Sequence, residues 1–303
     1  TVDELKEKLL PKYQAAIEAD VQTIMASYNS WNGVKCHGSK ELLTDILKVE
    51  MGFEGFVISD WQGIDEIPGN YKTDIITSIN AGIDMVMVSG QGQPYKKFMR
   101  LLKESVEEGS IPLARIDDAV TRILKVKLRN GLFENPIVKN DALQVIGSDS
   151  HRDIARQAVR ESMVVLKNQD IIPISKNSKS IVVAGRGADN LGMQCGGWTI
   201  NWQGGQGDIT VGTTILDGIK KSVSADTNVI YSIDGKDLAM AEDELAVVVI
   251  GEDPYTEFFG DKDNLDLLND DIETINTLKN KGYKVMVLLI SGRPMNIADH
   301  INS

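Results

Sequence analysis

The chain has 303 residues and a formal net charge of −12. This charge argues against a nucleic acid or an anionic membrane as the partner, because clustered Lys and Arg bind both. Two cysteines and three histidines suggest neither a disulfide framework nor a zinc site, and no metal is expected. The chain starts at Thr1 without a signal-peptide pattern, and both ends fall inside helical patterns, so we expect a fragment of a longer protein.

The first part of the chain, 1–132, alternates helical and strand patterns. Helices are predicted at 4–19, 41–48, 73–80, 95–108 and 115–128. Strands are predicted at 23–28, at the apolar run that ends at Asp60, and at 83–88. Strands separated by helices imply parallel βα units, from either a barrel or a doubly wound sheet. Three units are too few to close an eight-stranded barrel.

A turn-rich stretch at 133–150 is predicted to be a linker to a second domain, 151–303. This domain has a second α/β pattern. Its predicted helices are 151–166, 214–223 and 270–281, and its predicted strands are 180–184, 229–231, 245–250 and 284–290. The fold class is therefore α/β in both parts.

Asp60 and Trp61 directly follow a buried strand pattern. Catalytic groups project from the C-terminal ends of barrel strands. A carboxylate beside an indole suits a sugar-cleaving site, because the acid can meet the anomeric carbon while the ring stacks on a pyranose. The competing interpretation is that Asp60 caps a helix and Trp61 fills a core.

Three segments of the second domain have candidate roles. The turn 185–190 follows a strand, but it lacks the third glycine of a dinucleotide fingerprint, so an ordinary turn is favoured. Trp198 and Trp202 lie in a glycine-rich loop, and Trp202 is expected to be a buried plug between domains. The loop 251–261 contains acids among aromatics, a setting that can keep a carboxylic acid protonated. With Asp60 it suggests a two-carboxylate hydrolase of open stereochemistry.

Several motifs in one order make the chain resemble glycoside hydrolase family 3, especially its β-glucan exohydrolase and β-glucosidase branch. They are SYNSWNGVK (27–35), GFVISDW (55–61), RIDDAVTRIL (115–124), GLFENP (131–136), GGW (196–198) and GEDPYTE (251–257). The resemblance implies the C-terminal part of a (β/α)8-type barrel followed by an α/β sandwich domain, with the site between them. It also implies a retaining, exo-acting β-glycosidase that needs no cofactor, and an extracellular or periplasmic location.

By motif, the resemblance makes Asp60 the nucleophile and Glu257 the acid/base, with Glu252 as second choice. Trp61 and Trp198 resemble the indoles that clamp the sugar. Tyr28 and Met25, at a strand end, resemble neighbours of the nucleophile. The expected partner is a β-glucoside or a β-glucan oligosaccharide.

Two departures from the family pattern stand out. The chain begins after the strands that supply the family's Lys-His pair, Asp and Arg, which hold the non-reducing sugar. It also has Glu66 where exohydrolase relatives can carry an arginine. Two rival functions stay open, a nucleotide-dependent α/β enzyme and a non-catalytic carbohydrate-binding protein.

Overall fold

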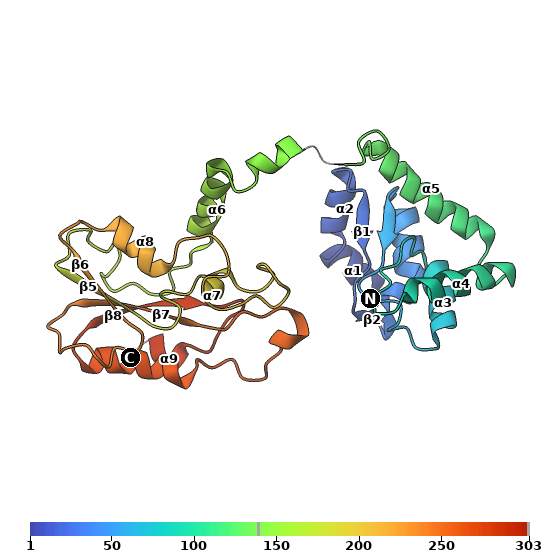
Figure 1. The fold of residues 1–303 in the computed structure, drawn as a ribbon. Helices are drawn as coiled ribbons and strands as arrows, with labels where there is room; N and C mark the ends of the chain where they lie inside the picture. The colour runs from blue at the N-terminus through green and yellow to red at the C-terminus, as the bar shows by residue number, and fades with distance from the viewer. Residues whose placement is uncertain (138–139, 302–303) are drawn as a thin grey trace. The chain divides into compact units, whose positions relative to one another are not determined.

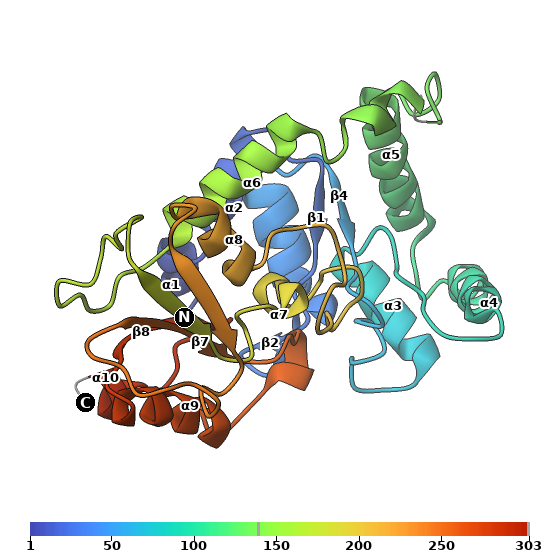
Figure 2. The same ribbon diagram turned by 60° about the vertical axis from the view of Figure 1, so that its left-hand side comes forward.

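The computed structural model describes residues 1–137 and 140–301, and the chain divides into two compact units, Thr1–Arg156 and Gln157–Ser303. Residues 138 and 139 of the predicted linker, and the last two residues of the predicted second domain, lie outside the described residues. Figures 1 and 2 show the elements of both units.

The first unit contains helices and short strands in alternation. The helices are α1 Val2–Lys8, α2 Pro11–Glu18, α3 Tyr71–Ala81, α4 Pro94–Glu107 and α5 Leu113–Arg129, with shorter or wider helical turns η1 Cys36–Gly38, η2 Glu41–Glu50 and η3 Asn140–Val145. The helix α6 Asp149–Ser162 begins in this unit and ends in the second. The strands are β1 Thr23–Met25, β2 Ser30–Trp31, β3 Val34–Lys35 and β4 Phe56–Ile58. β1 and β4 pair in parallel, and β2 and β3 form a small antiparallel hairpin.

Several of the predicted elements up to residue 166 are wrong in detail. The strand predicted over 23–28 ends at Met25. The helix predicted over 4–19 is two helices, because Pro11 lacks an N–H and starts α2 at its first turn. The strand predicted over 83–88 is only a bridge between Ile58 and Met85, since the amides of Asp84 and Met85 both donate to the carbonyl of Val57. The helix predicted over 151–166 ends at Ser162, before a pair of valines with low helix propensity.

A buried ion-pair network fastens β4 to the helices around it. Asp84 accepts a hydrogen bond from the N–H of Val57 (2.8 Å) and pairs with Lys48 (2.8 Å) and Arg115. Arg122 donates to the carbonyl of Gly55, just before β4 (2.9 Å). Buried charges are tolerated where each has partners, so this network sets the position of the strand that leads to Asp60.

The second unit is a parallel four-stranded sheet with helices on both faces (Figures 1 and 2). Its strand order is β6 Asn228–Ser232, β5 Ser180–Ala184, β7 Leu245–Gly251, β8 Lys284–Ile290. The helices are α7 Leu191–Cys195, α8 Ile215–Ser222, α9 Asn269–Asn280 and α10 Ala298–Ile301, with the short turn η4 Glu257–Gly260.

Alternate residues of the central strands point to opposite faces of the sheet and pack into two separate cores. Val182 and Val248 pack with Leu278 of α9, whereas Ile181 and Val247 pack with Leu216 of α8. This is the pattern of a parallel sheet that is covered on both faces. The loops that follow β5, β7 and β8 therefore leave the sheet at one edge, where ligands bind in open α/β folds.

Candidate active site

Asp60 lies just beyond the end of β4, in a turn where both its backbone N–H and its carbonyl make hydrogen bonds. Its N–H donates to Nε2 of His37 (2.9 Å). Its carbonyl accepts hydrogen bonds from the hydroxyl of Ser59 (2.9 Å) and the N–H of Gly63 (3.1 Å). Its Oδ1 accepts one from the N–H of Trp61 (2.6 Å). The backbone therefore sets the direction of this carboxylate.

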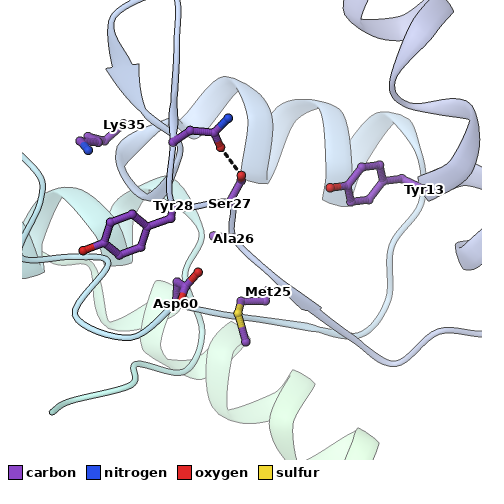
Figure 3. Close-up of a pocket in the computed structure, with 8 residues that line it drawn as sticks. Tyr13, Met25, Ala26, Ser27, Tyr28, Lys35 and Asp60 are labelled. Atoms are coloured by element: carbon purple, nitrogen blue, oxygen red, sulfur yellow. Dashed lines mark hydrogen bonds between the residues drawn. The ribbon is translucent and has the colours of Figure 1, made fainter. Parts of the chain in front are cut away.

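Asp60 lines an open hollow of about 600 Å³ on the first unit, and Figure 3 shows the side chains around it. Met25 and Tyr28, both predicted to neighbour the nucleophile, line the same hollow. Met25 is brought there by register, since it pairs with Ile58, the last residue of β4. The other lining residues are Tyr13, Ala26, Ser27, Asn29 and Lys35.

Tyr28 is held in a charged setting next to Asp60. Lys35 lies 5.7 Å from the centre of its ring and 3.6 Å from Glu66. Burial, followed by the negative charges of Glu66 and Asp60, raises the pKa of the Tyr28 hydroxyl. The hydroxyl is thus protonated at neutral pH and can donate a hydrogen bond, but it is no base. Trp61, the other predicted sugar contact of this unit, is 62% exposed.

In the second unit, Glu257 and Trp198 line one hollow of about 440 Å³, together with Glu252. Both residues have left-handed backbones, with φ of 50° at Glu257 and 62° at Trp198. Such conformations are uncommon for residues with side chains and often occur at functional sites. Trp198 is 68% exposed.

Thr256 ties the loop of Glu257 to the loop of Trp198. Its hydroxyl donates to the carbonyl of Trp202 (2.9 Å) and accepts from the amide of Gln203 (2.7 Å). Its N–H donates to Oε1 of Gln203 (3.1 Å). The backbone N–H of Trp198 in turn donates to the carbonyl of Trp202 (3.0 Å), so one chain of hydrogen bonds runs from the backbone of Trp198 to the loop of Glu257.

The same two loops are also in van der Waals contact. A Cβ added at Gly197 would lie 2.2 Å from the carbonyl oxygen of Tyr255, so only glycine permits this approach. Trp202 packs edge-on against Phe258 and Phe259 of η4, with ring centres 5.8 and 5.3 Å away. At 39% exposed it is less exposed than Trp198, but it is not the buried plug that was predicted, since it packs on the aromatic rings of its own unit.

Glu252 has a different environment from Glu257. It is buried, and it accepts hydrogen bonds from Ser291 (2.8 Å), Lys262 (3.3 Å) and Arg293 (3.2 Å). Burial alone would raise its pKa, but the Ser291 and Lys262 hydrogen bonds and the Arg293 charge lower it overall. An ionised carboxylate with three partners is a poor proton donor, so Glu252 fits the role of a structural anchor between the loops after β7 and β8.

The glycine-rich turn at 185–190 is accounted for by packing. Arg186 spans from this turn to the loop after β7, where it bonds the carbonyl of Gly251 and the carboxylate of Asp253. The N–H of Gly187 donates to the carbonyl of Val249 (3.1 Å). These bonds give the turn a structural role at the end of β7, which supports the ordinary-turn interpretation.

Sequence reasoning missed two residues that hold the candidate acids. His37 contacts the peptide of Asp60 from a turn far away in the sequence, and Thr256 stands beside Glu257 as a neutral residue. The only available signal for Thr256 was its place directly before the acid. No pattern in the sequence around His37 indicates its contact with Asp60.

In the described part of the chain, residues 1–137 and 140–301, no group of three or more His, Cys, Asp or Glu side chains could hold a metal ion. None of its helices is long and apolar enough to cross a membrane. Cys36 is buried and Cys195 is exposed, and both are free thiols.

Comparison with known proteins gives two family matches and several relatives. Residues 1–126 match the glycosyl hydrolase family 3 N terminal domain, and residues 163–303 match the C-terminal domain of the same family. The lysosomal beta glucosidase of Dictyostelium discoideum is 33% identical over 96% of this chain and 38% of its own length. A beta-xylosidase of Formosa agariphila is 31% identical over 97% of this chain and 44% of its own. The chain therefore spans less than half the length of these relatives.

Solved structures show the same likeness. The exo-1,3/1,4-beta-glucanase of a Pseudoalteromonas species superposes with a TM-score of 0.85 at 37% identity, over 96% of this chain and 37% of that one. The beta-glucosidase of Listeria innocua in complex with glucose gives 0.85 at 26% identity, over all of this chain and 42% of that one. These matches confirm the predicted fold class, part of a (β/α)8-type barrel followed by an α/β sandwich domain. The chain belongs to glycosyl hydrolase family 3.

Proposed function

We propose that this chain is part of a retaining, exo-acting β-glycosidase of the β-glucosidase or exo-β-glucanase class. The observation that carries the proposal is the strand-end carboxylate of Asp60, which is directed by its turn into an open hollow that Tyr28 and Met25 also line. Relatives named as β-glucosidases and an exo-β-glucanase support the reaction class. The proposed ligand is a terminal β-glucosyl residue, and no cofactor takes part.

In the proposed mechanism, Asp60 attacks the anomeric carbon while Glu257 protonates the departing glycosidic oxygen. Oδ1 of Asp60 already accepts a hydrogen bond from Trp61, so we assign the attack to Oδ2. A water molecule then attacks the glycosyl-enzyme, gives its proton to Glu257 and releases Asp60. Retention requires the two carboxyl groups to come within about 5–5.5 Å of each other when substrate is bound. Residues 1–132 would supply the nucleophile and residues 151–303 the acid/base.

Sugar binding is assigned to the aromatic side chains around the two acids. The exposed indoles of Trp61 and Trp198 would stack on the faces of a pyranose, a use that suits rings with one wet face. The protonated hydroxyl of Tyr28 would donate a hydrogen bond near the nucleophile. Met25 would supply an apolar contact from the neighbouring strand.

A mechanism-based label tests the proposal in the full-length gene product. An activated 2-deoxy-2-fluoro β-glucoside should add one sugar per protein, and peptide mapping should place it on Asp60. The Asp60→Asn variant should bind glucose but accept no label. Label on another residue would overturn the assignment of the nucleophile. Binding of a β-glucan oligosaccharide with neither label nor turnover would favour a non-catalytic binding protein, and a parallel β-xyloside probe reports sugar preference.

A further inference from the structure

His37 is a fully buried imidazole that contacts the peptide of the proposed nucleophile. It lies in η1, directly after the β2–β3 hairpin. The N–H of Asp60 donates to its Nε2 at 2.9 Å, so Nε2 must be unprotonated. Burial, opposed by the charge of Asp60 and assisted by that of Lys35, lowers the pKa of His37. The ring is therefore neutral and carries its proton on Nδ1.

The ring of His37 is fixed mainly by shape. Tyr28 meets it edge-on, with ring centres 6.4 Å apart and planes at 80°. A Cβ added at Gly63 would lie 2.3 Å from Nε2, so the turn after Asp60 can approach the ring only because residue 63 is glycine. Nδ1 is buried and has no hydrogen-bond partner within the described part of the chain. The bond to Asp60 is thus the polar contact that this buried side chain makes there.

The position of this bond matters because of what else holds Asp60. The hydroxyl of Ser59 and the N–H of Gly63 both bond the carbonyl of Asp60. His37 bonds the other end of the same residue, its N–H. With both ends held, the Cα–Cβ bond of Asp60 has a fixed direction, and the Trp61 N–H then orients the carboxylate.

We propose that His37 is a positioning residue, which holds the peptide of Asp60 so that its carboxylate stands ready for attack on the anomeric carbon. This inference rests on the proposed function, since it takes Asp60 as the nucleophile. Covalent attack needs the reacting atoms about 3–3.5 Å apart and aligned, and a misplacement of about 1 Å can lower the rate about 100-fold. A neutral buried acceptor fixes the peptide without adding charge beside a carboxylate.

Two matched variants separate positioning from core filling. His37→Phe keeps a ring of similar shape and removes the acceptor, whereas His37→Gln places an amide oxygen near the position of Nε2. In the full-length gene product, we expect His37→Phe to slow labelling of Asp60 by the 2-fluoro glucoside by about 10- to 100-fold at saturating reagent. His37→Gln should recover most of that loss. Glucose affinity should change little in either variant.

The protonation state of the ring gives a readout that is independent of activity. In protein labelled with ¹⁵N-histidine, the ring nitrogen signals of His37, assigned by their loss in His37→Gln, should report the neutral tautomer with its proton on Nδ1 at neutral pH. A proton on Nε2 would overturn the proposal whatever the kinetics. This measurement also decides the matter if His37→Phe does not fold.

The kinetic outcomes distinguish this inference from the proposed function. Equal losses in folded His37→Phe and His37→Gln, or full activity in His37→Phe, would overturn the positioning role while leaving Asp60 as the nucleophile. Labelling that persists in Asp60→Asn would instead contradict the proposed function. Slow labelling in His37→Phe with recovery in His37→Gln and the expected tautomer would support the inference.

Discussion

At the scale of single residues, Glu252 and Glu257 stand in different surroundings although they belong to the same loop. Glu252 is buried among Ser291, Lys262 and Arg293, which lower its pKa and keep it ionised. Glu257 stands in a left-handed turn at the edge of the hollow, outside this network. The surroundings of Glu252 argue against it as a proton donor, and the acid/base role proposed for Glu257 stays a prediction.

Substitutions of Glu257 and Glu252 should differ in how strongly their effect on the rate depends on the leaving group. In the full-length gene product, Glu257→Ala should slow hydrolysis of substrates with poor leaving groups by about 10²–10⁴-fold, and of activated aryl glucosides far less, because only poor leaving groups need protonation. Glu252→Gln should affect both substrate types alike and lower the thermal midpoint. A selective loss in Glu252→Gln, measured as kcat/KM over a leaving-group series, would reassign the acid role.

His37 should also make the stability of the first unit depend on pH. Its pKa is lowered in the folded state by burial, so below its ordinary value near 6.5 the unfolded chain binds a proton more readily. Its contribution to the free energy of unfolding is then fully present above that value and is lost as the pH falls towards the lower folded pKa. The free energy of unfolding, measured with urea at pH 7.5 and at pH 5.5, should fall more between these two pH values in the wild type than in His37→Gln. Equal losses would mean that His37 is not neutral in the fold.

At the scale of elements, the hydrogen bonds of Thr256 couple the loop of Trp198 to the loop of Glu257. Both loops leave the same edge of the parallel sheet, and both carry a residue with a left-handed backbone at the hollow. A side chain that bonds Trp202 and Gln203 at once limits how far the two loops can separate. The backbones that carry Trp198 and Glu257 are therefore tied to each other.

Thr256→Val tests this coupling, because it keeps the shape and removes the hydroxyl. We expect a loss of about 1–3 kcal/mol in the free energy of unfolding, since the amide of Gln203 loses a partner. Acrylamide should also quench the fluorescence of the loop indoles more strongly. Thr256→Ser keeps the hydroxyl and is the matched control. If the valine and serine variants behave alike, the hydroxyl does not couple the loops.

Much of the secondary structure follows from the sequence, but short-range geometry does not. The strands β5 and β8 have the predicted bounds, because their apolar runs are bounded by polar residues. The hairpin of β2 and β3 is not predicted, since strands of two residues carry no periodic signal. The break before Pro11 is readable from proline chemistry, although the helical pattern of apolar residues runs through it.

The candidate site, too, is predictable from the sequence only in part. The motif that ends at Asp60 and the acidic loop with Glu257 can be picked out, because catalytic groups follow buried strands and burial beside aromatics can tune an acid. The contact of His37 with the peptide of Asp60 cannot be predicted from the sequence, since it joins two turns that only the packing of the first unit brings together. Residues that hold a catalytic group show no pattern of their own in a single sequence.

At the scale of the whole molecule, the contacts around Asp60 leave one side of the proposed sugar site open. Met25 and Tyr28 are exposed residues in a hollow that is open to solvent. The parallel pairing described in the first unit joins β1, β4 and the bridge at Met85. The family resemblance implies further sugar-holding residues, and this chain spans less than half the length of its relatives. None of the contacts described around Asp60 replaces those residues.

The 303-residue chain by itself should therefore react slowly. Holding a substrate in the attack geometry can supply about 7–11 kcal/mol of barrier reduction, so an open sugar site should cost much of the rate. We expect the activated 2-fluoro glucoside to label Asp60 at least about 100-fold more slowly in this chain than in the full-length gene product. Intact-mass measurements over time test this, with Asp60→Asn of the same chain as the blank. Fast, stoichiometric labelling of the chain alone would contradict this prediction. It would mean that the residues around Asp60, among them His37, Tyr28 and Met25, are sufficient to hold the sugar for attack.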